Sequence, residues 1–114
     1  MTLAENVPGD TSAMAISELV ASPSLPPMVS VAITAYNSAN WLPRALDSVL
    51  KQQIDFPIEI VIGDDCSQDE TIRIAHSYSD RHPGMIKVLE RSKNIGIQRN
   101  YYETFLHCQG KFIA

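Results

Sequence analysis

Hydrophobic residues follow two alternating patterns along most of the chain. Runs of consecutive apolar, often β-branched residues predict buried strands at residues 29–33, 58–62, 85–89 and 111–114. Between these runs, apolar residues recur at helical spacing and predict helices over residues 41–50, 67–78 and 97–105. Strands that alternate with helices form right-handed βαβ units around a mostly parallel sheet. The predicted fold class is therefore α/β, a Rossmann-like half-domain with about four strands and three helices.

Several residues carry signals for the ends of these helices. Pro43 stands in the first turn of the first helix, where proline is tolerated. Ser67 and Glu70 fit an S-x-x-E capping box, which predicts that the second helix begins there, with Asp69 as an acid in its first turn. Gly110 is the predicted C-cap of the third helix. The apolar positions of that third helix are Ile97, Tyr101 and Phe105.

The first 27 residues differ from the rest of the chain. They are rich in Ala, Ser, Thr and Pro and end in the prolines of Ser22–Pro27, which disfavour both a helix and a central strand. Residues 12–21 contain enough apolar positions for one short helix, which is marginal without packing. We interpret residues 1–27 as a tail or linker that can contain this helix, and residues 28–114 as the folded unit.

Composition excludes several classes of protein. The chain has 114 residues, 45% of them hydrophobic and 19% charged, which suits one soluble domain. The net charge of −4 gives no support to a nucleic-acid partner, and no apolar run approaches the ~20 residues of a membrane span. Cys66 and Cys108 fit no zinc spacing, and the N-terminus has no signal-peptide pattern. Free thiols in a cytoplasmic protein are the simplest interpretation.

Three polar segments follow predicted strands directly. They are residues 34–37, 63–69 and 91–99. Because parallel α/β sheets bind ligands beyond the carboxyl ends of their strands, we expect these segments to lie together and form a binding site.

The acidic pair Asp64 and Asp65 is the most informative feature of this edge. Adjacent carboxylates are costly unless they meet solvent, a donor or a ligand. They can accept hydrogen bonds from an N–H group and from ribose hydroxyls, or help to hold a cation. The alternative is that either carboxylate caps the next helix through its backbone N–H groups.

The other two segments also carry candidate ligands, each with an alternative. Tyr36 can stack on a base, and Thr34 and Asn37 can bond its edge or a ribose; alternatively, Tyr36 packs and Asn37 only forms a turn. Around the third helix start, Asn94, Gly96 and Arg99 can receive a phosphate through backbone N–H groups and a guanidinium. Alternatively, Arg99 forms a weak surface ion pair with Glu103 at i+4.

Three motifs, VSVAITAYN, EIVIGDDCSQDET and NIGIQRN, together resemble the N-terminal half of family 2 glycosyltransferases, an inverting group with the GT-A fold. The resemblance covers residues 28–114. Cys66 stands where glycine is often found in this family, and this form of the motif resembles a bacterial branch that builds surface polysaccharides.

The resemblance implies roles for the candidate residues. Thr34, Tyr36 and Asn37 match the segment that lines the base and ribose of a nucleotide sugar. Asp64 matches the carboxylate that bonds the uracil N3–H, with Asp65 as its neighbour in the same pocket. The remaining matches are Asn94 and Gly96 in the loop after the third strand and Arg99 near the base or the diphosphate.

The resemblance also implies a reaction. The expected function is transfer of a sugar from a nucleotide-diphosphate sugar, most simply a UDP-sugar, to a saccharide acceptor, by an enzyme in the cytoplasm or at the inner face of the membrane. In the family, a D-x-D motif that binds Mn²⁺ or Mg²⁺ follows the fourth strand, and the general base lies further downstream. Neither motif occurs before Ala114, so we expect residues 1–114 alone to bind no metal and to be inactive.

Two other functions stay open from the sequence. A receiver-like signalling domain is also α/β with paired acids, but it would carry them after the first strand, where residues 34–37 have none. A non-catalytic interaction module that docks a partner through residues 1–27 is the second. Homo-oligomers formed by strand pairing at residues 111–114 are compatible with either function.

Overall fold

The computed structural model describes residues 14–15 and 26–114. Its main sheet has four parallel strands in the order β5-β4-β2-β6. These strands are β2 (Val29–Ala35), β4 (Ile58–Asp64), β5 (Ile86–Glu90) and β6 (Phe112–Ile113). The prediction of a mostly parallel α/β sheet with four strands is confirmed.

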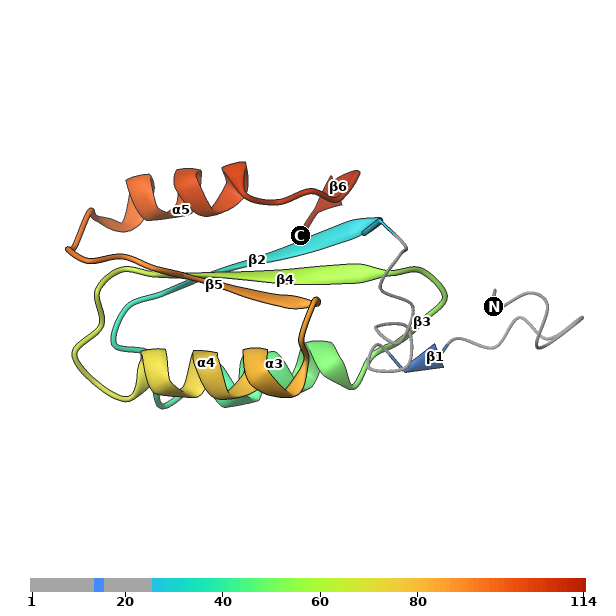
Figure 1. Cartoon of the computed structure of the whole chain (residues 1–114), viewed down its shortest axis with the longest axis horizontal. Helices are drawn as coiled ribbons and strands as arrows, with labels where there is room; N and C mark the ends of the chain where they lie inside the picture. The colour runs from blue at the N-terminus through green and yellow to red at the C-terminus, as the bar shows by residue number, and fades with distance from the viewer. Residues whose placement is uncertain (1–13, 16–25) are drawn as a thin grey trace, which may run out of the picture.

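Three helices cover the two faces of this sheet. Helices α3 (Leu42–Leu50) and α4 (Thr71–Arg81) lie on one face, and α5 (Ile97–Leu106) lies on the other (Figure 1). Pro43 stands at the start of α3, as predicted. None of the helices that the structure describes could span a membrane.

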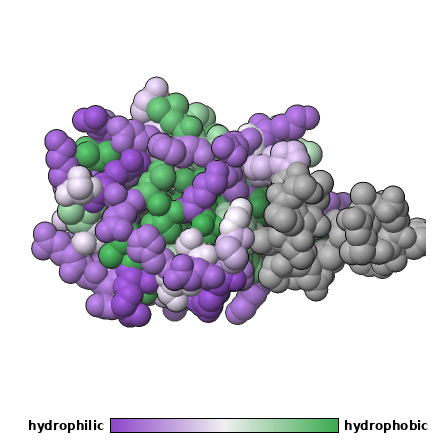
Figure 2. All heavy atoms as spheres, viewed as in Figure 1, coloured by the Kyte–Doolittle hydropathy of each residue, from purple (hydrophilic) through white to green (hydrophobic). Residues whose placement is uncertain are grey.

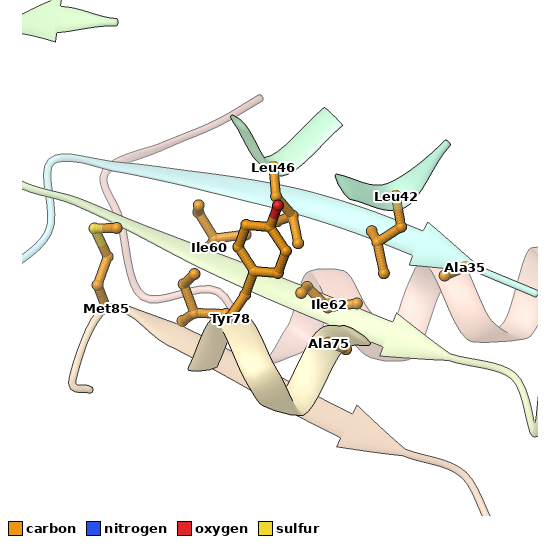
Figure 3. Close-up of a cluster of buried hydrophobic side chains, with 9 residues drawn as sticks. Ala35, Leu42, Leu46, Ile60, Ile62, Ala75, Tyr78 and Met85 are labelled. Carbon is orange, nitrogen blue, oxygen red and sulfur yellow. The ribbon is translucent and has the colours of Figure 1, made fainter. Parts of the chain in front are cut away.

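The hydrophobic core fills the layer between the sheet and helices α3 and α4. Figure 3 shows side chains from β2, β4, α3 and α4 pointing into this layer. The buried members are Ala35, Leu42, Leu46, Ile60, Ile62, Ala75, Tyr78, Met85 and Ile86. Burying each large aliphatic side chain of this kind contributes roughly 1.5–3 kcal/mol, so this layer holds the sheet to two of its three helices.

Helix α5 packs on the other face through polar and small residues. Asn100 and Thr104 are its buried side chains, and they lie against Gly63 of β4. Ile97, Tyr101 and Phe105, the apolar positions expected from the sequence, are all exposed instead. Figure 2 shows hydrophobic atoms reaching the surface over α5, among polar ones. The helix was therefore predicted correctly, but its buried face was not.

Two of the predicted helix ends are wrong. Helix α4 begins at Thr71, with Glu70 as its N-cap and no side-chain cap hydrogen bond, so Ser67 and Glu70 form no capping box. Helix α5 ends at Leu106 with His107 as its C-cap, so Gly110 is not the cap. Gly110 is instead packed on β2, since a Cβ there would lie 2.7 Å from the Ser30 amide nitrogen.

A small second sheet was not predicted. It pairs β1 (Met14–Ala15) antiparallel with β3 (Gln53–Ile54). Residues 14 and 15 are thus in a strand, although they fall within the short helix expected over residues 12–21. The other residues of that expected helix lie outside the described residues, as does most of the tail or linker assigned to residues 1–27.

Candidate functional site

The three polar segments meet at one edge of the main sheet. The loops that follow β2, β4 and β5 all emerge at the carboxyl ends of the strands, on the left in Figure 1. This is the edge at which parallel α/β sheets bind ligands. The expected juxtaposition of the segments is therefore confirmed.

The alternation of side chains along the strands sorts the candidate residues between the two faces. Ala35 and Ile62 belong to the core on the side of α3 and α4, so the residues next to them point toward α5. On the α5 side, Gly63 touches Asn100 and Thr104. Asp64 follows Gly63 and returns to the core side, and Asp65 comes back to the side of α5.

An open pocket of about 270 Å³ lies on the α5 side at this edge. Three of the predicted site residues line it: Thr34, Tyr36 and Asp65. Ala35, Ile97 and Asn100 complete the lining, and the last two were missed from the sequence. Tyr36 is 50% exposed and Ile97 is 82% exposed, so both leave apolar surface open to a ligand. The pocket thus combines apolar surface with one buried acid, which suits a flat, polar-edged ring.

Asp65 connects the pocket to the loop after β5. Asp65 is 3% exposed, and its carboxylate accepts hydrogen bonds from the backbone N–H groups of Ile95 at 2.7 Å and Gly96 at 3.0 Å. The Asn94 side-chain amide donates to the Asp65 carbonyl oxygen at 3.3 Å. A carboxylate has about four acceptor positions, so Asp65 retains capacity for a ligand donor while it orders this loop.

Asp64 has a different set of partners. Its carboxylate accepts hydrogen bonds from the Ser67 backbone N–H at 3.1 Å and from the Ser67 hydroxyl. The Ser67 hydroxyl oxygen accepts from the Asn37 backbone N–H at 2.8 Å, and the Asn37 side-chain oxygen accepts from the Gln68 N–H at 2.8 Å. Asp64 and Asn37 therefore join the loops after β2 and β4 and do not line the pocket.

A second set of hydrogen bonds joins the same two loops. The Asp69 carboxylate accepts from the Thr71 backbone N–H at 2.9 Å and from the Ala39 N–H at 3.2 Å. A further hydrogen bond from the Thr71 hydroxyl is the largest cause that holds the pKa of Asp69 below its ordinary value. Asp69, rather than Ser67, thus provides the side-chain acceptor at the start of α4.

The loop before α5 differs from the phosphate site expected there. Gly96 has a φ of 92°, which favours glycine, but its N–H group donates to Asp65 and to the Asn94 side-chain oxygen. A second hollow of about 400 Å³ lies beside the pocket, lined by residues 95–99. The Arg99 side chain contributes to this hollow and donates from Nε to Glu103 at 3.2 Å. This ion pair is the alternative weighed from the sequence.

The described residues contain no cluster of side chains that could ligate a metal ion. Within residues 14–15 and 26–114, no group of three or more His, Cys, Asp or Glu side chains can hold an ion. The two carboxylates at the site, Asp64 and Asp65, already accept protein hydrogen bonds. These side chains do not fit a divalent-ion site by themselves.

Nucleotide-binding domains typically have a parallel α/β sheet with a pocket at the carboxyl ends of its strands. Such pockets combine apolar surface with a few polar or acidic groups. The sequence pattern of Glycosyl transferase family 2 matches residues 30–114. The chain belongs to this family.

Relatives of established name agree with this assignment. Chondroitin synthase of Escherichia coli is 36% identical over 88 residues, which are 77% of this chain and 12% of that protein. The minor teichoic acid biosynthesis protein GgaA of Bacillus subtilis is 38% identical over 65 residues, which are 55% of this chain and 15% of that protein.

Solved structures give the same fold. TarS of S. aureus, in complex with UDP-GlcNAc, has a TM-score of 0.65 and 31% identity, covering 75% of this chain and 24% of that chain. The mannosyltransferase PcManGT of Pyrobaculum calidifontis, in complex with GDP-Man and Mn²⁺, has a TM-score of 0.66 and 25% identity, covering 80% of this chain and 27% of that chain. The fold is the Rossmann-like GT-A fold of these glycosyltransferases. The chain spans between 12% and 31% of the length of the curated relatives it matches.

Proposed function

We propose that residues 28–114 form the nucleotide-binding part of an inverting glycosyltransferase that uses a nucleotide-diphosphate sugar, most simply a UDP-sugar. The observation that carries this proposal is the pocket at the carboxyl edge of the sheet, where Thr34, Tyr36 and Asp65 meet. Family membership and the nucleotide sugars bound by the two solved relatives support it.

Within this proposal, Asp65 rather than Asp64 accepts the uracil N3–H. Asp65 lines the pocket beside Tyr36, whereas the Asp64 carboxylate is directed to Ser67. The half-exposed Tyr36 ring stacks on the base, an interaction worth roughly 1–3 kcal/mol per base in other proteins. Thr34 supplies a hydroxyl at the same wall of the pocket. Asp64 and Asn37 then serve the site indirectly, because they hold its two loops together.

The hollow beside the pocket is the proposed place of the diphosphate. Arg99 lines that hollow, and its exposed guanidinium is free to exchange Glu103 for a phosphate oxygen. Gly96 cannot offer its N–H group at the same time, because Asp65 already accepts it. Asn94 and Gly96 are therefore proposed to shape the loop, and Arg99 to contact the phosphate.

The chemical step needs groups beyond the described residues. We place the divalent-ion ligands and the general base of the inverting displacement outside the described residues, as the family resemblance implies. When bound, such an ion would neutralise charge on the leaving diphosphate. Residues 1–114 alone are accordingly proposed to transfer no sugar.

The proposed biological setting is a bacterial one, and a named relative supports it. GgaA is a teichoic acid biosynthesis protein, which supports a saccharide acceptor in bacterial surface polysaccharide synthesis. Action at the inner face of the membrane and homo-oligomers formed through the edge strand β6 stay predictions. Because the chain belongs to Glycosyl transferase family 2, the alternative of a receiver-like signalling domain is excluded.

Calorimetric titration of the full-length protein with UDP, GDP and AMP in the presence of Mn²⁺ tests the proposal. The expected result is tighter binding of UDP than of GDP, with AMP weakest. Equal binding of all three nucleotides, or no binding, would contradict the proposed function. Tighter binding of GDP would keep the glycosyltransferase and change the donor.

A further inference from the structure

A largely buried arginine contacts two residues of α5, one of which lines the pocket. Arg91 directly follows β5, and its side chain is only 15% exposed. Its Nε atom donates to the Asn100 side-chain oxygen at 3.2 Å. Its Nη1 atom pairs with the Glu103 carboxylate at 3.2 Å. One guanidinium thus joins the end of the sheet to two positions on the helix that borders the pocket.

The contact with Asn100 fixes the orientation of an amide in the pocket wall. The Asn100 side-chain nitrogen donates to the Gly63 carbonyl oxygen at 2.9 Å, while its oxygen accepts from Arg91. Turning the amide over would face the Arg91 donor with another donor and the Gly63 carbonyl with an oxygen. Asn100 is 2% exposed and lines the pocket together with Tyr36 and Asp65.

The contact with Glu103 links Arg91 to Arg99, which lines the neighbouring hollow. One oxygen of the Glu103 carboxylate pairs with Arg91 and the other with Arg99. The two arginines therefore share one acid, and Arg91 remains to neutralise Glu103 when Arg99 turns away from it. Arg91 in this way contacts Asn100, which lines the pocket, and Glu103, which pairs with Arg99 of the hollow.

We infer that Arg91 is a positioning residue of the nucleotide site, which acts by holding the Asn100 amide and the Glu103 carboxylate in place. This inference rests on the proposed function. Packing alone is a poor explanation for an arginine here, because its buried Nη2 atom has no hydrogen-bond partner among the described residues. An apolar side chain would fill the space without that cost, and lysine would lack the planar fork that reaches both partners.

A double-mutant cycle on nucleotide affinity tests the inference. We expect Arg91→Met to weaken UDP binding to the full-length protein about tenfold. Arg91→Lys should weaken UDP binding nearly as much. Because Arg91 acts mainly through Asn100, adding Arg91→Met to Asn100→Ala should cause little further loss. Arg73→Met is the matched control, since Arg73 is an exposed arginine on α4 whose partner is Glu70. That control should leave the affinity unchanged.

Each outcome separates the inference from the function on which it depends. The wild-type protein and Arg91→Met are compared at a temperature below the melting temperature of the variant. If both bind UDP equally well, Arg91 only stabilises the fold and the inference is wrong. Full additivity of the two substitutions would also overturn it. If the wild-type protein binds neither UDP nor GDP, the proposed function itself fails, and the inference fails with it.

A measurement on the wild-type protein covers the case in which the variants do not fold. With asparagine labelled by ¹⁵N, the Asn100 side-chain amide should exchange slowly with solvent and shift its resonance when UDP is added. A rapidly exchanging Asn100 amide, or one that UDP does not perturb, would contradict the positioning role.

Discussion

Replacing Gly63 with alanine should separate α5 from the sheet and damage the pocket. A Cβ at this position would lie 1.9 Å from the Thr104 hydroxyl oxygen and 2.9 Å from the Asn100 side-chain oxygen. An ordinary contact is at least 3.4 Å, so either the Thr104 hydroxyl must rotate out of its present position or the helix must shift away from the sheet. Overpacking of this kind costs roughly 1–3 kcal/mol, and we expect the upper end because Thr104 also donates to the Asn100 carbonyl at 2.7 Å.

The assay is urea denaturation of the full-length protein, read together with its affinity for UDP. Gly63→Ala should lower the free energy of unfolding by about 3 kcal/mol and weaken UDP binding, because Asn100 lines the pocket. Gly84→Ala is the control: nothing lies within 4 Å of its Cβ position, and only its φ of 83° makes alanine unfavourable. That control should cost about 1 kcal/mol and leave UDP affinity unchanged.

A second substitution identifies the clash. Thr104→Ala removes the oxygen at 1.9 Å, and alone it should cost about 1 kcal/mol for the lost hydrogen bond. Combined with Gly63→Ala, it should give a total cost below the sum of the two single costs. If Gly63→Ala is as stable as the wild type, or if the two costs simply add, the close packing of α5 on β4 is refuted.

Two further predictions concern residues outside the pocket. Cys66 has a φ of 60°, so Cys66→Gly should raise the free energy of unfolding by up to about 1 kcal/mol in urea denaturation, whereas Cys66→Ala should not. Burial alone would raise the pKa of Glu59, but hydrogen bonds from Ser30 and the Gln109 N–H and the nearby Lys87 ammonium hold it below its ordinary value. Glu59 therefore stabilises the folded state at pH values above its unfolded-state pKa. This stabilisation is lost as the pH falls through the lower folded-state pKa of Glu59. Thermal melts from pH 7 to pH 3 should show a smaller acid loss in Glu59→Gln than in the wild type; an unchanged acid loss would contradict this role.

The strands and helices were predictable because their hydrophobic patterns are strong. The β-branched runs at 29–33 and 58–62 became the two central strands, and Pro43 correctly indicated the start of α3. The pairing of β1 with β3 was not predictable, because two-residue strands carry no periodicity.

The failures at helix α4 and helix α5 have identifiable physical causes. Ser67 matched a capping motif, but its hydroxyl is engaged by Asp64 and Asn37 before the helix begins. The apolar stripe of α5 lies in solvent because Asn100 and Thr104 are the residues that pack on Gly63. A glycine inside a strand signals a close approach of another segment, and this signal was present in the sequence.

The pocket residues were predictable in part. Thr34, Tyr36 and Asp65 meet as expected, and the two-residue period of β4 could have separated Asp65 from Asp64 in advance. Asn100 was not recognisable as a pocket residue, because its position depends on Gly63 and Arg91, which lie on other segments of the chain.

The central claim is that the pocket beside Tyr36 binds the base of a nucleotide sugar. Titration of UDP into full-length Tyr36→Ala and Tyr101→Ala variants tests it most directly, because Tyr101 is similarly exposed but does not line the pocket. Loss of base stacking predicts an affinity for UDP that is weaker by roughly 1–3 kcal/mol in Tyr36→Ala and unchanged in Tyr101→Ala. Equal affinity of Tyr36→Ala and the wild type for UDP would contradict the account.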